Sequence, residues 1–579
     1  MGAHHSVTVL AADSGRLPVN GLDYLILAIY FLVVVGIGVM ARRAITTSED
    51  FLLSGRSLPA WITGLAFISA NLGAIEILGM AANGAQYGLA TVHFYWIGAV
   101  PAMVFLGLVM MPFYYGSRVH SVPDYLRRRY NNPTHQFNAW TFALASVLIA
   151  GVNLYALALV IESLLGWPTW VSIIVSAGFV LAYITLGGLS GAIYNEVLQF
   201  FVILAGLIPI VIVGLSKVGG WGGLQDKIVA SQPNGSALFS QWGGVGVGHP
   251  TNPLGDWIGI VFGLGFVLSF GYWTTNFAEV QRALAAKDLS AGQRTPLIGA
   301  YPKIFIPALT IIPGLIALVL VPNLGKGGAS ITETGGENPT FNDAIPRLMG
   351  LLLPNGVLGI ALTGLLAAFM AGMAANVSSF NTVFTYDIWR PYFRPGRPDS
   401  YYLRVGRFAT VAGVLIGIAT AFIASGYSNI MNYIQLLFSI FNAPLFATFI
   451  IGMLWRRTTP WGGFWGLVAG TLGAVIGHFA FTGLDIGGWH VWDPWVTIES
   501  TQAQNFYGAI IAFVADAVVT VVVSLMTQPK PERELAGLVA GVPNPDAPPP
   551  GPKPPWWQSP PLLGFGALAI TLVLSLIFL

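Results

Sequence analysis

The stretch Ile68–Gly79 reads I-S-A-N-L-G-A-I-E-I-L-G and places a carboxylate in the middle of an apolar segment. The segment is long enough for a membrane helix and begins near Leu58. Asn71, Gly73 and Glu76 stand close together there, although unpaired polar groups are costly in hydrocarbon. A small, polar and acidic interruption at this depth predicts a broken helix that lines a water-filled site. The alternative is a glycine-softened helix whose Glu76 pairs with a neighbouring helix.

The composition is that of an integral membrane protein. Of 579 residues, 55% are hydrophobic and 9% are charged, and the mean hydropathy is +0.70, whereas soluble domains carry about 25% charged residues. The absence of cysteine excludes disulfides and cysteine-ligated metals. A net charge of +2 gives no sign of a nucleic-acid partner. Residues 1–20 lack the pattern of a removable signal peptide, so we expect the first helix to direct insertion.

Apolar segments recur along the whole chain. Fourteen of them are long enough to cross a bilayer, which takes about 20 residues. With the N-terminus outside, the loops hold twenty Lys and Arg residues on the inner side and five on the outer side. This asymmetry favours a multi-pass protein of the cell membrane with its N- and C-termini outside. The predicted spans lie near 22–41, 59–83, 88–113, 136–164, 168–186, 190–216, 255–280, 297–321, 355–386, 403–424, 430–454, 461–482, 504–526 and 561–579.

Spans 2–6 and 7–11 form two groups of five, inverted in the membrane because an odd number of spans separates their first helices. Each group opens with a helix rich in polar and small residues, S-A-N-L-G and S-F-G-Y-W-T-T-N respectively. Such interrupted helices at corresponding positions mark transporter sites. A later proline-rich stretch predicts a stiff, extended linker that holds the last helix loosely. The expected parts are a tail with peripheral helix 1 at 1–58, five-helix groups at 59–217 and 255–455, peripheral helices 12 and 13 at 456–528, the cytoplasmic linker at 529–560 and helix 14 at 561–579.

Four further charged or polar residues lie within predicted spans. Glu162 is near an outer helix end and is expected to reach the interface. Glu196 follows G-G-L-S-G-A-I-Y-N and either caps a helix start, where the dipole favours an acid, or belongs to a site. Lys303 either snorkels to the inner surface or faces a polar cavity. Gln435 stands one turn into its helix and says little alone. The histidines lack metal-site spacing, and no nucleophile or phosphate-binding motif is present in the sequence.

The chain resembles the sodium/solute symporter family, and within it the sodium/glucose cotransporter branch. The matching segments run in order from the first predicted helix to the twelfth, so the resemblance covers most of the chain. They are specific for the family and not for the substrate. They are D-F-L-L-S-G-R-S-L-P-A-W at 50–61, S-A-N-L-G-A at 69–74, G-G-L-S-G-A-I-Y-N-E-V-L-Q at 187–199, Y-W-T-T-N-F-A-E-V-Q-R-A-L-A-A-K at 272–287, F-N-T-V-F-T-Y-D-I-W at 380–389, Y-I-Q at 433–435 and L-W-R-R-T-T-P-W-G-G-F-W-G at 454–466.

The resemblance implies an all-α membrane protein of about 14 transmembrane helices. It implies a LeuT-type core of two inverted five-helix repeats, each with a broken first helix, which assigns 59–217 and 255–455 as the repeats. Solute and sodium are then expected to bind near the bilayer midplane, beside the first broken helix. The implied solute contacts are Lys303 and Gln435, the implied inner-gate aromatic is Tyr272, and the implied outer-gate side chains are Met80, Phe94 and Met431.

Three solute-site positions depart from the sugar-transporting pattern. Glu76 stands where that branch has a neutral residue, Tyr95 where it usually has Glu, and Ser269 where it has Asn. One carboxylate is thus displaced across the expected cavity, and glucose or galactose does not follow from the resemblance. We expect Glu76 and Lys303 to pair in the empty site and to separate when solute binds.

The implied sodium site departs further. The family holds sodium with backbone carbonyls, here those of Ser69, Leu72 and Ala368, and with two hydroxyl side chains, whose positions fall on Ala371 and Gly372. Hard cations need several oxygen ligands, so two missing hydroxyls leave the shell short. Glu196 matches a second acidic cation position and is the candidate for a second cation or a proton. Three couplings remain open: sodium with a water-completed shell, a proton on Glu76 or Glu196, or none.

The expected function is secondary active uptake of a small polar solute, foremost a sugar, by alternating access. Amino acids or small organic acids are the alternative solutes, because Lys303 would suit a carboxylate. A second class of function is a solute-gated ion leak or sensor on the same fold, for which the incomplete sodium site is the argument. No residue pattern supports an enzyme.

Overall fold

The computed structural model describes residues 17–42, 54–117, 119–232, 235–247, 250–326, 339–486, 489–545 and 553–578. Within these residues, eleven helices are long and apolar enough to cross a membrane, and two bent helix pairs bring the number to thirteen. Helices dominate, and two short strands, β1 and β2, pair antiparallel. The spans predicted at 168–186 and 190–216 lie in one helix, α10 (Thr169–Val218), of which Gly191–Val218 is long enough to cross a membrane and Thr169–Leu181 is a shorter apolar segment, so the fourteenth span is not confirmed.

The elements of the first half surround the first broken helix. They are α2 (Gly21–Arg42), η1 (Ser54–Arg56), α4 (Ala60–Asn71), η2 (Ile75–Gly79), α5 (Met80–Tyr87), η3 (Gly88–Val92), η4 (Phe94–Ala99), α6 (Val100–Phe105), η5 (Leu106–Met110), α7 (Met111–Gly116), α8 (Val122–Arg129), α9 (Asn132–Leu165), α10 (Thr169–Val218), α11 (Gly220–Ser231) and η6 (Ala237–Phe239).

The second half begins with the second broken helix. Its elements are η7 (Gly259–Ser269), α12 (Phe270–Thr275), α13 (Phe277–Leu284), α14 (Leu289–Leu320), η8 (Phe341–Asp343), α15 (Ala344–Leu352), α16 (Val357–Val383), η9 (Phe384–Phe393), α17 (Asp399–Ala424), α18 (Ile430–Leu454), α19 (Pro460–Thr482), β1 (Leu484–Ile486), β2 (Trp489–Trp492), α20 (Thr501–Met526), η10 (Glu532–Leu535), η11 (Trp556–Gln558) and α21 (Pro560–Ile577).

Both predicted helix breaks are present. The chain bends by 57° between α4 and the helix that starts at Ile75. The amide N–H of Leu72 donates to the carbonyls of Ile68 and Ser69, each at 3.0 Å, which closes the last turn of α4. The second bend, of 49°, falls at Asn276, whose Oδ1 accepts a hydrogen bond from the N–H of Ala278 at 3.0 Å and caps α13.

Helix α14 packs against both halves of the first broken helix. Small residues permit the close approach: a Cβ at Gly84 would lie 2.5 Å from the carbonyl oxygen of Ile311, and one at Gly64 would lie 2.9 Å from Cβ of Ile298. Helices α9, α10 and α16 pack on one another, α10 and α16 also pack on α4, and α9 contacts η2. The broken helix therefore lies in the centre of the bundle, where its open backbone groups are shielded from lipid.

The proline-rich linker differs from the expectation of an extended, loose tether. Its first part is docked, with Leu535, Leu538, Val539 and Val542 buried in the same apolar cluster as Tyr125. The Tyr125 hydroxyl donates to the Leu538 carbonyl at 2.5 Å. The last helix, α21, also packs on α14. Scattered apolar side chains among the prolines supply the buried surface that composition alone does not indicate.

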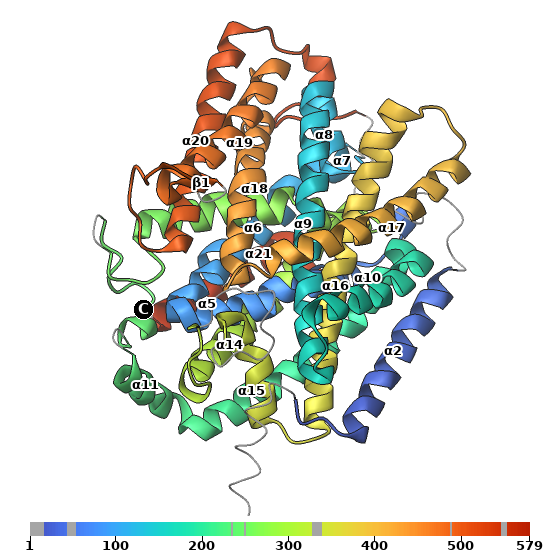
Figure 1. Ribbon diagram of the computed structural model, residues 1–579. Helices are drawn as coiled ribbons and strands as arrows, with labels where there is room; N and C mark the ends of the chain where they lie inside the picture. The colour runs from blue at the N-terminus through green and yellow to red at the C-terminus, as the bar shows by residue number, and fades with distance from the viewer. Residues whose placement is uncertain are drawn as a thin grey trace, which may run out of the picture.

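The two ends of the bundle carry different elements. Helices α7 and α8 lie at one end, and α11 and α15, from segments predicted outside, lie at the other (Figure 1). This arrangement is compatible with the predicted alternation of loops. The side of the membrane on which each end lies stays a prediction from the Lys and Arg distribution.

Candidate functional site

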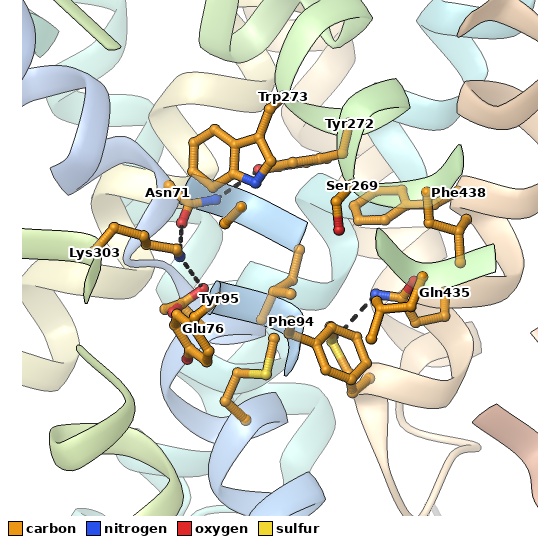
Figure 2. Close-up of a pocket in the computed structure, with 16 residues that line it drawn as sticks. Asn71, Glu76, Phe94, Tyr95, Ser269, Tyr272, Trp273, Lys303, Gln435 and Phe438 are labelled. Atoms are coloured by element: carbon orange, nitrogen blue, oxygen red, sulfur yellow. Dashed lines mark hydrogen bonds and ion pairs between the residues drawn. The ribbon is translucent and has the colours of Figure 1, made fainter. Parts of the chain in front are cut away.

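A cavity opens beside the break of the first broken helix (Figure 2). Every residue that the sequence predicted to contact solute or to form a gate lines it, although those residues come from five separate parts of the chain. Its lining consists of Asn71, Ile75, Glu76, Met80, Phe94, Tyr95, Ala99, Leu264, Leu268, Ser269, Tyr272, Trp273, Lys303, Met431, Gln435 and Phe438.

Lys303 and Glu76 form a buried ion pair in this cavity. The Lys303 Nζ lies 2.7 Å from Glu76 Oε2 and donates to Asn71 Oδ1 at 2.5 Å (Figure 2). The ammonium also lies 4.9 Å from the centre of the Tyr95 ring and 5.1 Å from that of Trp273. Lys303 thus faces the cavity and does not snorkel. The predicted pairing is confirmed, and Glu76 both lines a cavity and pairs with a neighbouring helix.

A line of hydrogen bonds continues from the ion pair to a second carboxylate. Asn71 Nδ2 donates to the Tyr272 hydroxyl at 2.9 Å, and that hydroxyl donates to Glu279 Oε1 at 2.7 Å. The Tyr272 ring packs on Phe438 with ring centres 4.7 Å apart. Tyr272 therefore connects the cavity to the polar groups on its far side. The series from Lys303 through Asn71 and Tyr272 to Glu279 is called the relay below.

Two buried acceptor atoms in the cavity lining have no hydrogen-bond partner among the residues that the structure describes. They are Glu76 Oε1 and Gln435 Oε1, both on buried side chains. The Gln435 amide nitrogen contacts only the Met431 sulfur, at 4.0 Å, among the described residues. In contrast, the Tyr95 hydroxyl is bonded to Thr310 Oγ1 at 2.9 Å, so its ring is the part available to a ligand. Buried acceptors without partners indicate a place for a ligand that donates hydrogen bonds.

Side-chain amides bridge the helices beside the cavity. Asn429 Nδ2 donates to Asn83 Oδ1 at 2.9 Å and to Gln86 Oε1 at 2.7 Å. Gln502 Nε2 donates to Asn432 Oδ1 at 2.8 Å. These contacts join α5, α18 and α20 just beyond the predicted outer-gate methionines. The sequence offered no signal for this amide cluster beyond the residue types themselves.

The predicted sodium positions do not supply a complete set of ligands. The Ser69 carbonyl accepts the N–H of Leu72, and Ala371 and Gly372 bring no side-chain oxygen. Instead, the side-chain amide of Asn153, from α9, lies beside Gly372. Its Oδ1 accepts a hydrogen bond from the N–H of Ala74 at 3.0 Å.

Glycines make room for the Asn153 amide. A Cβ at Gly73 would lie 2.6 Å from Asn153 Oδ1, and a Cβ at Gly372 would overlap the same atom. The space that a hydroxyl side chain at position 372 would use is therefore filled by an amide from another helix. With no side-chain oxygen at positions 371 and 372 and with the Ser69 carbonyl already bonded, the predicted residues fit a sodium ion poorly at this position.

Glu196 lies apart from the cavity, in a second buried ion pair. It belongs to the interior of α10, so the alternative of a helix-start cap is wrong. Arg282 binds it with two nitrogens, Nε at 3.3 Å from Oε2 and a closer terminal nitrogen to Oε1. Glu162, at the end of α9, is partly exposed and accepts from the Thr169 hydroxyl at 2.8 Å, outside the cavity lining; its reach to the membrane interface stays a prediction.

Sequence reasoning missed Glu279, Asn153 and Trp273. Glu279 lies within the family segment 272–287 as an acid among apolar neighbours, F-A-E-V, and that pattern was the available signal. Asn153 interrupts the apolar run of α9 in the same way. Single polar residues in a span are common enough that neither position stood out without its neighbours in space.

The family model for the sodium:solute symporter family matches residues 51–470. The chain belongs to the sodium:solute symporter family. Membership makes this symporter-family protein a secondary transporter and not an enzyme. Its curated relatives include the sodium/glucose cotransporter of Vibrio parahaemolyticus, 29% identical over 77% of this chain and 83% of the relative. Sodium/glucose cotransporter 2 of Rattus norvegicus is 30% identical over 90% of this chain and 80% of its own. Sodium/myo-inositol cotransporter 2 of Oryctolagus cuniculus is 28% identical, with coverages of 89% and 78%.

Solved structures show the same fold. A sodium-coupled sialic acid symporter in a substrate-bound, outward-open state superposes with a TM-score of 0.69 at 18% identity, covering 88% of this symporter-family chain and 99% of its own. Mhp1, a nucleobase-cation-symport-1 family transporter, superposes with a TM-score of 0.51 at 13% identity, with coverages of 84% and 97%. The LeuT-type fold expected from the sequence is thereby confirmed.

Proposed function

We propose that this transporter takes up a neutral, polyhydroxylated solute of sugar size by alternating access, with the cavity beside Glu76 as the solute site. The observation that carries the proposal is the pair of buried acceptors without partners, Glu76 Oε1 and Gln435 Oε1. A sugar or polyol carries hydroxyl donors that satisfy both, whereas a carboxylate solute brings only further acceptors.

The charge of the cavity supports a neutral solute. Lys303, the cation of the lining, is already neutralised by Glu76 at 2.7 Å and also held by Asn71. An anionic solute that bound Lys303 would have to separate it from Glu76. The Glu76 carboxylate would then be left buried without a partner and would repel the anion. Aromatic rings of Phe94, Tyr272 and Phe438 complete the lining and offer flat apolar surfaces to a sugar ring.

One other solute class has a specific observation in its favour. A zwitterionic amino acid could divide the ion pair, with its carboxylate on Lys303 and its ammonium on Glu76. Its one ammonium group would then have to serve both Glu76 Oε1 and Gln435 Oε1, whereas a polyol offers several separate hydroxyl donors. The polyol therefore accounts for more of the unpartnered atoms, and the zwitterion is the competitor in the test.

We propose that sodium drives the uptake, on the strength of family membership.

Binding of unlabelled solutes to the purified protein should be measured by calorimetry with hexoses, myo-inositol, neutral amino acids and lactate. Gln435→Ala is expected to weaken polyol binding about tenfold, as for loss of a hydrogen bond to a buried partner. Gln136→Ala, an amide truncation on the exposed start of α9, is the matched control and should change nothing. Binding of amino acids or lactate without any polyol would refute the proposed solute class.

A further inference from the structure

A second cavity lies against the far side of Tyr272. It is small, and Tyr272 and Asn71 line both it and the solute cavity. Polar side chains gather there from three of the helices that meet at the breaks. The ones that the argument uses are Glu279 of α13, Asn153 of α9 and Asn376 of α16. We call this space the inner cavity.

Buried charges near the inner cavity do not balance. Glu76 pairs with Lys303, and Glu196 pairs with Arg282. Glu279 is 3% exposed, and its Oε2 has no hydrogen-bond partner. If all three carboxylates are ionised, they and the two cations carry a net charge of −1. An uncompensated buried charge is strongly unfavourable. The group is complete only when one further positive charge joins it.

The atoms around Glu279 are oxygen donors of the kind that sodium uses. Asn376 Nδ2 donates to the Gly372 carbonyl at 2.8 Å, which leaves its Oδ1 as the atom for a ligand. Asn153 Oδ1 accepts one hydrogen bond and keeps a second lone pair. A carboxylate oxygen with amide oxygens and water is a normal shell for a hard cation. A proton, by comparison, would need no amide oxygens.

Burial disfavours the ionised form of Glu279 while no cation is beside it, and two features of its surroundings oppose that cost. Tyr272 donates to its Oε1 at 2.7 Å, and a donor of this kind stabilises a carboxylate. The carboxylate lies in the first turn of α13, where the helix dipole favours a negative charge. One oxygen of Glu279 is bonded to Tyr272 and the other is open toward the cavity, so the open oxygen can bind a cation.

We propose that the inner cavity binds one monovalent cation of the sodium type, with Glu279 as its charged ligand and the amide oxygens of Asn153 and Asn376 beside it. Gly372 also lines the inner cavity, so this site adjoins the position of the missing hydroxyls and uses other side chains in their place. Through the relay, the cation and the solute act on the same Tyr272 hydroxyl from opposite sides. The proposal rests on membership in a sodium-coupled family and is independent of which solute binds.

The test measures cation binding without solute. Wild-type protein in detergent is titrated with NaCl, KCl or choline chloride at constant ionic strength, and the thermal midpoint is followed together with binding of radioactive sodium. A ligand raises the midpoint only by binding the folded state. Glu279→Gln keeps an oxygen for the Tyr272 hydroxyl and removes the charge. It is expected to weaken sodium binding by at least about tenfold, as for loss of a charged ligand.

Two further measurements separate the site from a folding defect. In choline alone, Glu279→Gln should melt no lower than the wild type, because it removes an uncompensated charge. Glu162→Gln is the matched control, an acid-to-amide change at the outer end of α9, and should bind sodium normally. Asn376→Leu should weaken sodium binding while retaining solute binding at high solute concentration.

Two results would overturn the proposal. The first is sodium binding by Glu279→Gln with wild-type affinity, which would place the ion elsewhere. The second is a wild type that no concentration of sodium stabilises more than potassium does. Both are distinct from failure of the proposed solute class, because neither measurement contains solute.

Discussion

Removal of Lys303 should cost far more stability than removal of a surface charge. The Nζ lies 2.7 Å from Glu76 Oε2, and the two side chains are 3% and 4% exposed. At an effective dielectric constant of about 20, charges at that separation attract by about 6 kcal/mol. Measured losses on breaking buried pairs are about 3–5 kcal/mol, because the remaining charge stays buried. We therefore expect Lys303→Met to lower the free energy of unfolding by about 3–5 kcal/mol.

The double variant Lys303→Met/Glu76→Gln should recover most of that loss, since no charge is then left unpaired. Unfolding would be followed by intrinsic fluorescence of the 18 tryptophans during titration of mixed micelles with a denaturing detergent. Glu532→Gln is the control: it breaks the Arg456–Glu532 pair, whose side chains are 54% and 71% exposed, and should cost less than about 1 kcal/mol. Equal losses for the buried and exposed pairs, or a double variant as unstable as the sum of the singles, would refute the reasoning.

Three other changes test separate contacts. Gly372→Ala should destabilise the fold by about 1–3 kcal/mol, because the new Cβ overlaps Asn153 Oδ1. Adding Asn153→Ala to the same chain should relieve most of this loss, measured in the same denaturation assay. Tyr272→Phe interrupts the relay, so sodium should no longer raise solute affinity, although calorimetry should still detect solute binding. Tyr125→Phe removes the hydrogen bond to the Leu538 carbonyl and should cost about 0.5–1.5 kcal/mol, with faster proteolysis of the docked linker; unchanged proteolysis would contradict that contact.

Local sequence rules predicted the parts of this site that lie on one helix. The break after Asn71 was predictable because glycine and polar residues interrupt a hydrophobic run, and a break inside the bundle shields the open backbone groups from lipid. Lys303 and Gln435 stood out as polar residues within spans, and the family resemblance assigned them to a solute site. Their position in one cavity agrees with it, while their roles in binding remain predictions. The docked linker was not predictable, since its prolines dominate the composition and its few buried side chains do not.

The sequence by itself determined that this is a helical membrane protein with two broken helices and an acid where one break opens. The tertiary structure decided which acids are paired. Glu196 meets Arg282, 86 positions away along the chain, and Glu76 meets Lys303, while Glu279 Oε2 has no hydrogen-bond partner within the described part of the chain. It also placed Asn153 beside Gly372, where the resemblance expected a hydroxyl. The physical reason is that hydropathy and backbone breaks are properties of neighbouring residues, whereas charge compensation depends on how separate helices rotate and pack.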